Sequence, residues 1–168
     1  MTKATKRKAT AAGAKTEEDF ALFATLVSLR DSVKKLAGPM TRAMLASYNL
    51  ILNRGRFFQP QPFPKGYRRG KAQDCYGNSS KLAMFKVGLT YCEGTVLCKF
   101  DTLISHVEHA WCITDDGKVI DVTLKNAGLF YFGVPFTLEE LEAITAFPAL
   151  DELVDREFAK DASADEAT

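Results

Sequence analysis

The sequence predicts a single α+β domain, and three observations lead to that class. Apolar residues recur at helical spacing in residues 20–52 and again in residues 138–158. Between these segments, residues 89–123 show the β-branched, alternating pattern of antiparallel strands. The chain has 168 residues, of which 46% are hydrophobic, and this suits one domain of about 100 to 200 residues. Separate runs of helices and strands are typical of the α+β class.

Two tails flank the predicted domain, which we place at residues 16–159. Residues 1–15 form a basic tail without aromatic or large aliphatic residues after Met1, and residues 160–168 form an acidic tail; we expect both to be disordered. No apolar run approaches the roughly 18 residues that a membrane span needs. The basic start also lacks the apolar centre of a signal peptide. We therefore expect no membrane association and a cytoplasmic location.

Two helices open the domain, and we expect them to pack as an antiparallel pair. Thr16 is a suitable N-cap before the acids of residues 17–19, which the helix dipole favours, and this helix should end at Gly38. Pro39 suits the first turn of the second helix, whose apolar stripe continues to Asn53.

Residues 54–73 are predicted to form a long ordered loop. They contain three prolines and three glycines, interleaved with aromatic and basic residues. Loops of this length usually have a function. We expect this loop to form one wall of a substrate cleft and, through its cations, to select an acidic or carboxylate-bearing substrate.

The remaining pattern changes from helix to strands and back to helices. The predicted elements are a helix from Asp74 through Phe85, strands at 89–99, 107–114, 118–123 and 129–132, a helix from Thr137 through Ile144, and a last helix from Pro148. Asp115-Asp116-Gly117 is the turn of a hairpin, because Asp-Gly favours the backbone angles of a tight turn. Thr137 and Glu140 form a capping box.

Cys75 is the candidate nucleophile. It lies at the predicted start of a helix, where unsatisfied backbone amides and the positive end of the dipole stabilise a thiolate, the reactive form of cysteine. Acyl transfer also needs an imidazole to carry protons and a carboxylate or amide to orient its ring. The hairpin offers both groups, His109 before the turn and Asp121 after it.

The register of the hairpin decides whether these two side chains can meet. A two-residue turn would place His109 opposite Leu124 and leave Asp121 on the other face of the sheet. A three-residue loop with a bulge changes the register by one and brings both side chains to one face, diagonally displaced. The sequence permits either register. The non-catalytic alternative is a packed thiol and a hydrogen-bonded core histidine.

The order of Cys75, His109-x-Trp111 and Asp121-x-Thr123 resembles the transglutaminase-like branch of the papain-like cysteine enzymes. This resemblance, over roughly residues 70–125, implies a papain-like fold and a thiol-dependent hydrolase or acyltransferase. Cys75 would attack an amide or isopeptide carbonyl of a protein or peptide-like substrate, His109 would transfer the proton and Asp121 would orient the ring. Peptidase, deamidase and transferase activities stay open, because they differ in what resolves the acyl-enzyme. No cofactor is implied.

A second resemblance is to small uncharacterised proteins of bacteria and their phages. The residues that carry it are Cys75-Tyr76-Gly77-Asn78, Tyr91-Cys92-Glu93-Gly94, His109-Ala110-Trp111 and Tyr131-Phe132-Gly133-Val134-Pro135-Phe136. It implies a bacterial or phage protein, located in the host cytoplasm if a phage encodes it.

Six further residues are candidates for binding the substrate: Gln73, Asn78, Glu93, Trp111, Tyr67 and Arg68. Gln73 would be a weaker oxyanion donor than the backbone amide of Cys75. Trp111 is expected to be a core residue or a pocket wall. For Glu93 an exposed carboxylate at a sheet edge is the commoner case, and a buried partner for the site is the alternative.

The four cysteines are expected to be free thiols, because the chain is large enough to fold without disulfides and carries no export signal. Cys92, Cys98, His106, His109 and Cys112 lack the paired short spacings of common zinc sites, so we expect no metal.

Charge is divided unevenly along the chain. Residues 1–73 carry 15 Lys and Arg against 4 acids, and residues 74–168 carry 7 against 17, which gives net charges of +11 and −10. The cations and aromatics of residues 54–73 suggest an alternative function, an inactive papain-like module that binds nucleic acid or a partner protein. We slightly favour the simpler interpretation, in which the aromatics pin the loop to the core and the cations balance the acidic half.

Overall fold

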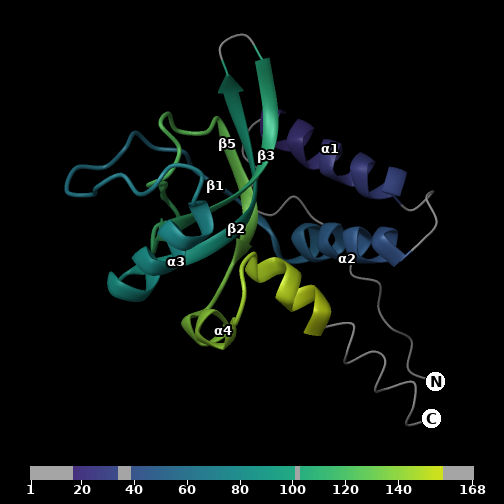
Figure 1. Cartoon of the computed structure of the whole chain (residues 1–168). Helices are drawn as coiled ribbons and strands as arrows, with labels where there is room; N and C mark the ends of the chain where they lie inside the picture. The colour runs from purple at the N-terminus through teal and green to yellow at the C-terminus, as the bar shows by residue number, and fades with distance from the viewer. Residues whose placement is uncertain (1–16, 34–38, 101–102, 157–168) are drawn as a thin grey trace.

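The computed structural model describes residues 17–33, 39–100 and 103–156. Within these ranges five antiparallel strands form one sheet in the order β1-β5-β2-β3-β4, with helices packed against it (Figure 1). The α+β class is therefore confirmed. The predicted tails 1–15 and 160–168, the cap at Thr16 and the end at Gly38 lie outside the described residues. No helix within the described ranges is both long and apolar enough to cross a membrane.

The helices agree closely with the sequence expectations. They are α1 (Glu17–Val33), α2 (Pro39–Arg54), α3 (Cys75–Phe85), α4 (Leu138–Ala143) and a last helical segment at 149–156. α1 and α2 lie side by side as an antiparallel pair (Figure 1). The capping box of α4 is present, because the Thr137 hydroxyl accepts from the Glu140 backbone and the Glu140 carboxylate accepts from the Thr137 backbone.

The strands differ from expectation at their ends. They are β1 (Arg56–Phe58), β2 (Leu89–Phe100), β3 (Leu103–Thr114), β4 (Val119–Ile120) and β5 (Phe130–Pro135). β1 lies in the segment predicted as loop, and pairs with β5 through buried Phe57 and Phe58. β3 begins four residues earlier than predicted, since it stays paired with β2 to the end of a long hairpin. β4 is shorter than predicted.

The two faces of the sheet are covered differently. On one face, Tyr91, Ala110 and Val134 pack against α2, α3, α4 and the last helix, and Phe132 packs against α1 and α2. On the other face, Trp111 and Tyr131 form a cluster with residues that include Phe58, Val96 and Val119. Figure 1 shows α1 and α2 on one side of the strands and the loop that follows β1 on the other.

Gly94 and Gly133 face each other where β2 pairs with β5. A Cβ atom built on Gly94 would lie 2.3 Å from the carbonyl oxygen of Phe132, and one on Gly133 would lie 2.6 Å from the ring of Trp111. Any side chain here would push the strands apart or displace Trp111, so glycine is required for this close approach. Gly94 is also the register partner of His109.

Candidate active site

Cys75 is the first residue of α3, and the edge of β3 holds the start of this helix. β4 pairs only with Cys112 and Ile113 of β3, so the backbone of Ala110 is free to bind α3 instead. Its carbonyl accepts a hydrogen bond from the Ser79 hydroxyl at 3.0 Å, and its backbone also forms a hydrogen bond with the Cys75 side chain. The thiol is thus fixed beside the strand that carries His109.

The hairpin has the register that brings His109 and Asp121 together. Cys112 pairs with Ile120 and Ile113 with Val119, as expected for a three-residue loop at 115–117. His109 Nε2 lies 2.9 Å from Asp121 Oδ2, and both side chains are buried. Because Nε2 is bonded to Asp121, Nδ1 is the ring nitrogen left to interact with the Cys75 thiol, whose pKa His109 lowers.

Three donors hold the Asp121 carboxylate. The backbone N–H groups of Thr123 and Leu124 donate to Oδ1 at 2.9 and 3.0 Å. The Tyr131 hydroxyl donates to Oδ2 at 3.0 Å. Burial by itself disfavours the carboxylate, but the hydrogen bond and charge of His109 and the two backbone bonds keep the pKa of Asp121 below its usual value. Asp121 therefore remains an anion that can orient a charged imidazole.

The electrostatics of the pair favour an ionised thiol. Burial opposes a charge on His109, but the hydrogen bonds to Asp121 and Cys75 and the charges of both residues outweigh it and raise the pKa of His109 to about 9. Burial likewise opposes ionisation of Cys75, but His109 and backbone hydrogen bonds from Ala110 and Tyr76 lower the pKa of this thiol. Both shifts favour a thiolate beside an imidazolium.

The environments of the other three cysteines oppose ionisation of their thiols. All four cysteines are free thiols, and Cys75 is the half-buried one. Burial raises the pKa of Cys92 and of Cys98, and raises that of Cys112 to about 12. The structure thus distinguishes Cys75 from the rest chemically as well as by position.

The basic loop fixes the segment that follows β4. Arg69 donates to the carbonyl oxygens of Leu124 and Lys125, the latter at 2.9 Å, and its guanidinium stacks on Phe63 at 3.9 Å from the ring centre. Gly70 N–H donates to the carbonyl of Val122 at 2.8 Å. The segment that carries Asp121 is therefore held by the loop.

Asn78 of α3 links the basic loop to the segment that follows β4. Its amide nitrogen donates to the Lys71 carbonyl at 2.7 Å and to the Thr123 hydroxyl at 2.9 Å, and its oxygen accepts from the Lys71 N–H. Tyr67 also has a structural role, because it packs beneath Lys86 and against the cluster around Val122. The expectation that the aromatics pin this loop to the core is confirmed.

Trp111 is a core residue. It is fully buried, its ring is stacked with His109 at an interplanar angle of 17°, and Tyr131 and Phe58 contact it edge-on. Its indole N–H has no hydrogen-bond partner among the described residues. The packing limits rotation of the His109 ring.

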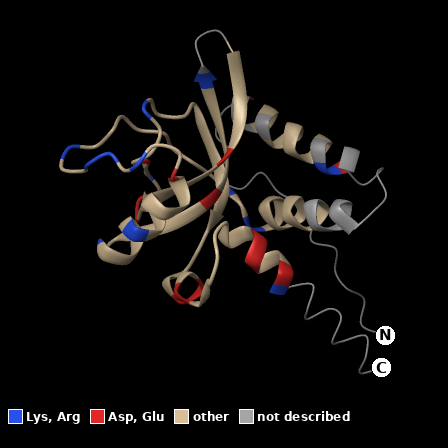
Figure 2. Ribbon diagram, viewed as in Figure 1, with Lys and Arg blue, Asp and Glu red and all other residues tan. Residues whose placement is uncertain are grey.

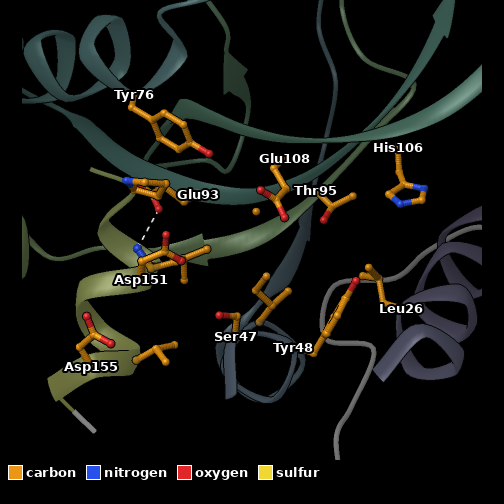
Figure 3. Close-up of a pocket in the computed structure, with 15 residues that line it drawn as sticks. Leu26, Ser47, Tyr48, Tyr76, Glu93, Thr95, His106, Glu108, Asp151 and Asp155 are labelled. Carbon is orange, nitrogen blue, oxygen red and sulfur yellow. Dashed lines mark hydrogen bonds between the residues drawn. The ribbon is translucent and has the colours of Figure 1, made fainter. Parts of the chain in front are cut away.

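A cleft of about 600 Å³ lies next to the start of α3, and Cys75, His109 and Asp121 are not among its lining residues. It lies between β2 and β3 on one side and α2 with the last helix on the other (Figure 3). Tyr76, the neighbour of Cys75, lines it, and so does Gly94, the register partner of His109. Four carboxylates line it, from Glu93, Glu108, Asp151 and Asp155.

This cleft differs from the one expected from the sequence. None of residues 54–73 lines it, and the charged side chains that do are acidic rather than basic. The expected basic wall is therefore absent from this cleft, and the selection of an acidic substrate by the loop stays a prediction. The reason is that Arg69 is bonded to backbone carbonyls, while Arg68 is exposed and lies outside the cleft lining.

Glu93 is buried, contrary to the commoner case expected from the sequence. Its carboxylate accepts from the backbone N–H groups of Ala149 and Leu150 at 2.7 and 2.8 Å and from the Tyr91 hydroxyl. Burial raises the pKa of Glu93 although these donors oppose the shift. Glu93 thus caps the last helix and forms part of the cleft wall (Figure 3).

The structure brings together Cys75, His109 and Asp121, and separates the predicted substrate-binding residues. Glu93 lines the cleft, Gln73 is exposed with a positive φ of 62°, and Asn78, Tyr67, Trp111 and Arg68 lie outside the cleft lining. Sequence reasoning missed Tyr131, which lies in an aromatic run that predicted only a strand. It also missed Thr95 and Glu108, which pair with each other across β2 and β3 and line the cleft.

No three His, Cys, Asp or Glu side chains of the described residues are grouped so that they could hold a metal ion. The β2–β3 register partly explains this, because Cys92 and His109 lie on one face of the sheet and His106 and Cys112 on the other.

Comparison with known proteins gave no matching family model, no matching curated protein and no matching solved structure. The function proposed below therefore depends on the geometry of the site.

Proposed function

We propose that this protein is a papain-like, transglutaminase-like thiol enzyme that hydrolyses or transfers an acyl group from an amide or isopeptide bond of a protein or peptide-like substrate. One observation supports this above all others. Asp121 Oδ2 lies 2.9 Å from Nε2 of His109, His109 lowers the pKa of Cys75, and Cys75 is the first residue of a helix. Nucleophile, proton carrier and orienting carboxylate are thus neighbours, as thiol-dependent acyl transfer needs.

Each residue has one chemical task in this reaction. The Cys75 thiolate attacks the carbonyl carbon and forms a C–S bond, while the electron pair of the C=O bond moves to oxygen. The intermediate collapses when the C–N bond breaks, and His109 gives its proton to the leaving nitrogen. Water or an amine, deprotonated by His109, then attacks the thioester carbonyl, and the C–S bond breaks to release the Cys75 thiolate beside the protonated His109. Asp121 keeps the ring oriented and stabilises its charged form.

The start of α3 offers a place for the oxyanion. Asp74 is the N-cap residue, but its side chain makes no capping hydrogen bond to the backbone of the helix. The first backbone bond of the helix runs from the Asn78 N–H to the Asp74 carbonyl, so the N–H of Cys75 is not used by the helix. This N–H is the donor we assign to the oxyanion, as the sequence suggested.

Selective acylation tests the proposal. Wild-type protein is incubated with p-nitrophenyl acetate at pH 7 and its intact mass is measured. We expect one acetyl group, located on Cys75 by peptide mapping, and none in Cys75→Ala. His109→Ala should lose most of the acylation rate, because the thiol would then be protonated at pH 7.

Cys98→Ala is the matched control, since it removes a buried cysteine whose pKa is raised. It should be acylated like the wild type. Equal acylation of all four cysteines, or acylation that survives in Cys75→Ala, would show that Cys75 is not an activated nucleophile.

A further inference from the structure

The cleft described above borders the start of α3, although Cys75 itself does not line it. Tyr76 lines it and is adjacent in sequence to Cys75, and the β2–β3 register places Gly94 of the cleft opposite His109. A peptide whose carbonyl reached Cys75 would have to extend a neighbouring side chain past Tyr76 to enter this cleft.

The walls of the cleft combine apolar and acidic surfaces. The apolar part comes from α1, α2 and the last helix, through Leu26, Ile51, Pro148, Leu150 and Val154. The charged part is negative throughout, and no Lys or Arg of the described residues lines it. Glu108, Asp151 and Asp155 have no ion-pair partner in the described part of the chain. Lys and Arg side chains have an apolar stem and a cationic tip, and so match both surfaces.

Thr95 provides independent evidence that a polar ligand belongs here. Its residue is 5% exposed and it lines the cleft, yet its hydroxyl makes no hydrogen bond to any described residue. Figure 3 shows Thr95 beside Glu108, both extending from the strands toward the space that Ser47 and Tyr48 face from α2. The Thr95 hydroxyl is not among the fully buried atoms that lack a partner, so it opens into the cleft and only a group in the cleft can bond it. A ligand that donates a hydrogen bond between Thr95 and Glu108 would complete this arrangement.

We propose that the cleft binds a lysine or arginine side chain of a peptide substrate whose scissile carbonyl lies at Cys75. This inference rests on the proposed function, because it takes Cys75 as the attacking group. The side chain places its stem along Leu150 and Ile51, and its cationic tip binds among the carboxylates of Glu108 and Asp151, with the Thr95 hydroxyl beside it. The substrate class is thus a basic peptide or a basic segment of a protein.

Matched covalent probes test this specificity. Three peptide vinyl sulfones are used that differ in the side chain next to the reactive group, which is lysine, glutamine or glutamate. The labelling rate of Cys75 is measured by intact mass and divided by the rate for iodoacetamide in the same variant, which corrects for changes in the thiol itself. The lysine probe should react about tenfold faster than the glutamate probe at low salt, and this ratio should fall as salt is added.

Two variants locate the preference. Glu108→Gln and Asp151→Asn should each reduce the lysine-to-glutamate ratio by about threefold or more, since each removes one charge from the cleft. Glu139→Gln is the control, because Glu139 is an exposed carboxylate on α4 outside the cleft. It should leave the ratio unchanged.

The outcomes separate the two proposals. If iodoacetamide labels Cys75 selectively but the three probes react equally, or glutamate is preferred, the cleft proposal is overturned and the proposed function stands. If the preference exists but Glu139→Gln reduces it as much as Glu108→Gln, the charge effect comes from the whole molecule and not from the cleft, which also overturns the proposal. If no reagent selects Cys75, both proposals fail.

Discussion

His109 is constrained on every side of its ring. Nε2 is bonded to Asp121, Cys75 is bonded to the ring as well, and Trp111 is stacked on its face. Asp121 is itself fixed by Tyr131 and by two backbone donors. The ring therefore needs little reorganisation to accept or release a proton, which is the advantage of a preorganised site.

Asp121→Asn tests the electrostatic part of this arrangement. The amide oxygen can still accept from Thr123 and Leu124, so the fold should be kept, but the negative charge beside His109 is lost. The pKa of His109 should then fall, and Cys75 should lose part of its thiolate. We expect the alkylation rate of Cys75 by iodoacetamide at pH 7 to fall about tenfold, the effect of roughly one pKa unit.

Asp116→Asn is the matched control for this variant. Asp116 is exposed at the tip of the β3–β4 hairpin and pairs with Lys118. Its replacement should leave the rate at the wild-type value. An Asp121→Asn protein as reactive as the wild type would mean that Asp121 does not support the thiolate.

The pH dependence of the site follows from the shifted pKa values of Cys75 and His109. The pKa of Cys75 is lowered, so its alkylation should reach half its plateau at a lower pH than that of an ordinary thiol. Cleavage of an amide also needs the proton on His109, whose pKa is raised to about 9. Amide turnover should therefore rise with pH as the thiolate forms and fall again above about pH 9. A cleavage rate that keeps rising through pH 10 would contradict this assignment of His109.

At the scale of elements, the last helix depends on a side chain from the middle of the sheet. Glu93 accepts from the first two N–H groups of the segment 149–156 and from Tyr91. Glu152 adds a second attachment, since its carboxylate accepts from the backbone of Thr145 and Ala146 at 2.7 and 3.0 Å. The helix that forms the acidic wall of the cleft is thus fixed mainly through hydrogen bonds near its start.

Glu93→Ala should detach the start of this helix. Three donors would lose their acceptor, and we expect the free energy of unfolding to fall by about 1–3 kcal/mol in urea titrations at pH 7. Hydrogen exchange in residues 149–156 should accelerate. Glu142→Ala, at an exposed position of α4, should change the unfolding free energy by less than about 0.5 kcal/mol. An unchanged exchange rate in Glu93→Ala would show that the carboxylate does not hold the helix.

Element types were predictable because they depend on local pattern, whereas register and polar pairing were not. The helical spacing and the capping box located α1 to α4, and Asp115-Asp116-Gly117 located the hairpin. The choice between a two- and a three-residue turn was left open by the sequence, although it decides whether His109 and Asp121 share a face. β1 was missed because three residues among prolines and glycines give too short a pattern, and its pairing with β5 is a long-range contact.

The candidate site likewise contains some residues that could be predicted from the sequence and others that could not. Cys75, His109 and Asp121 could be proposed because residue type and order carry the chemistry. Glu93 was misjudged, since burial next to Ala149 depends on how the chain ends pack against the sheet. The acidic cleft could not be foreseen for the same reason, because its walls come from elements that are distant in sequence.

For the whole molecule, charge is separated in space as it is in sequence. Figure 2 shows basic residues along the loop that follows β1 and acidic residues on the last helix. In that loop Arg69 is bonded to carbonyls, while Lys65, Arg68 and Lys71 are exposed. In that loop, these three cations are available to bind nucleic acid, which is the alternative function.

Retention on heparin measures how strongly these three exposed cations bind a polyanion. We expect weak retention at 50 mM salt that is lost by about 0.3 M, because few cations are available to release counterions. The triple variant Lys65→Ala, Arg68→Ala, Lys71→Ala should elute clearly earlier, with Arg69 left intact so that the loop keeps its contacts. Retention that persists at 0.5 M salt would instead favour a dedicated polyanion-binding function.

The attachment of the last helix to Glu93 matters to anyone who shortens this protein. A truncation before Ala149 would remove, in one cut, the partners of a buried acid and the side of the cleft that carries Asp151 and Asp155. Folding and selectivity would then be lost together and could not be told apart. Single replacements on the outward turn of that helix keep the two separate, so they are the better tools for dissecting this chain.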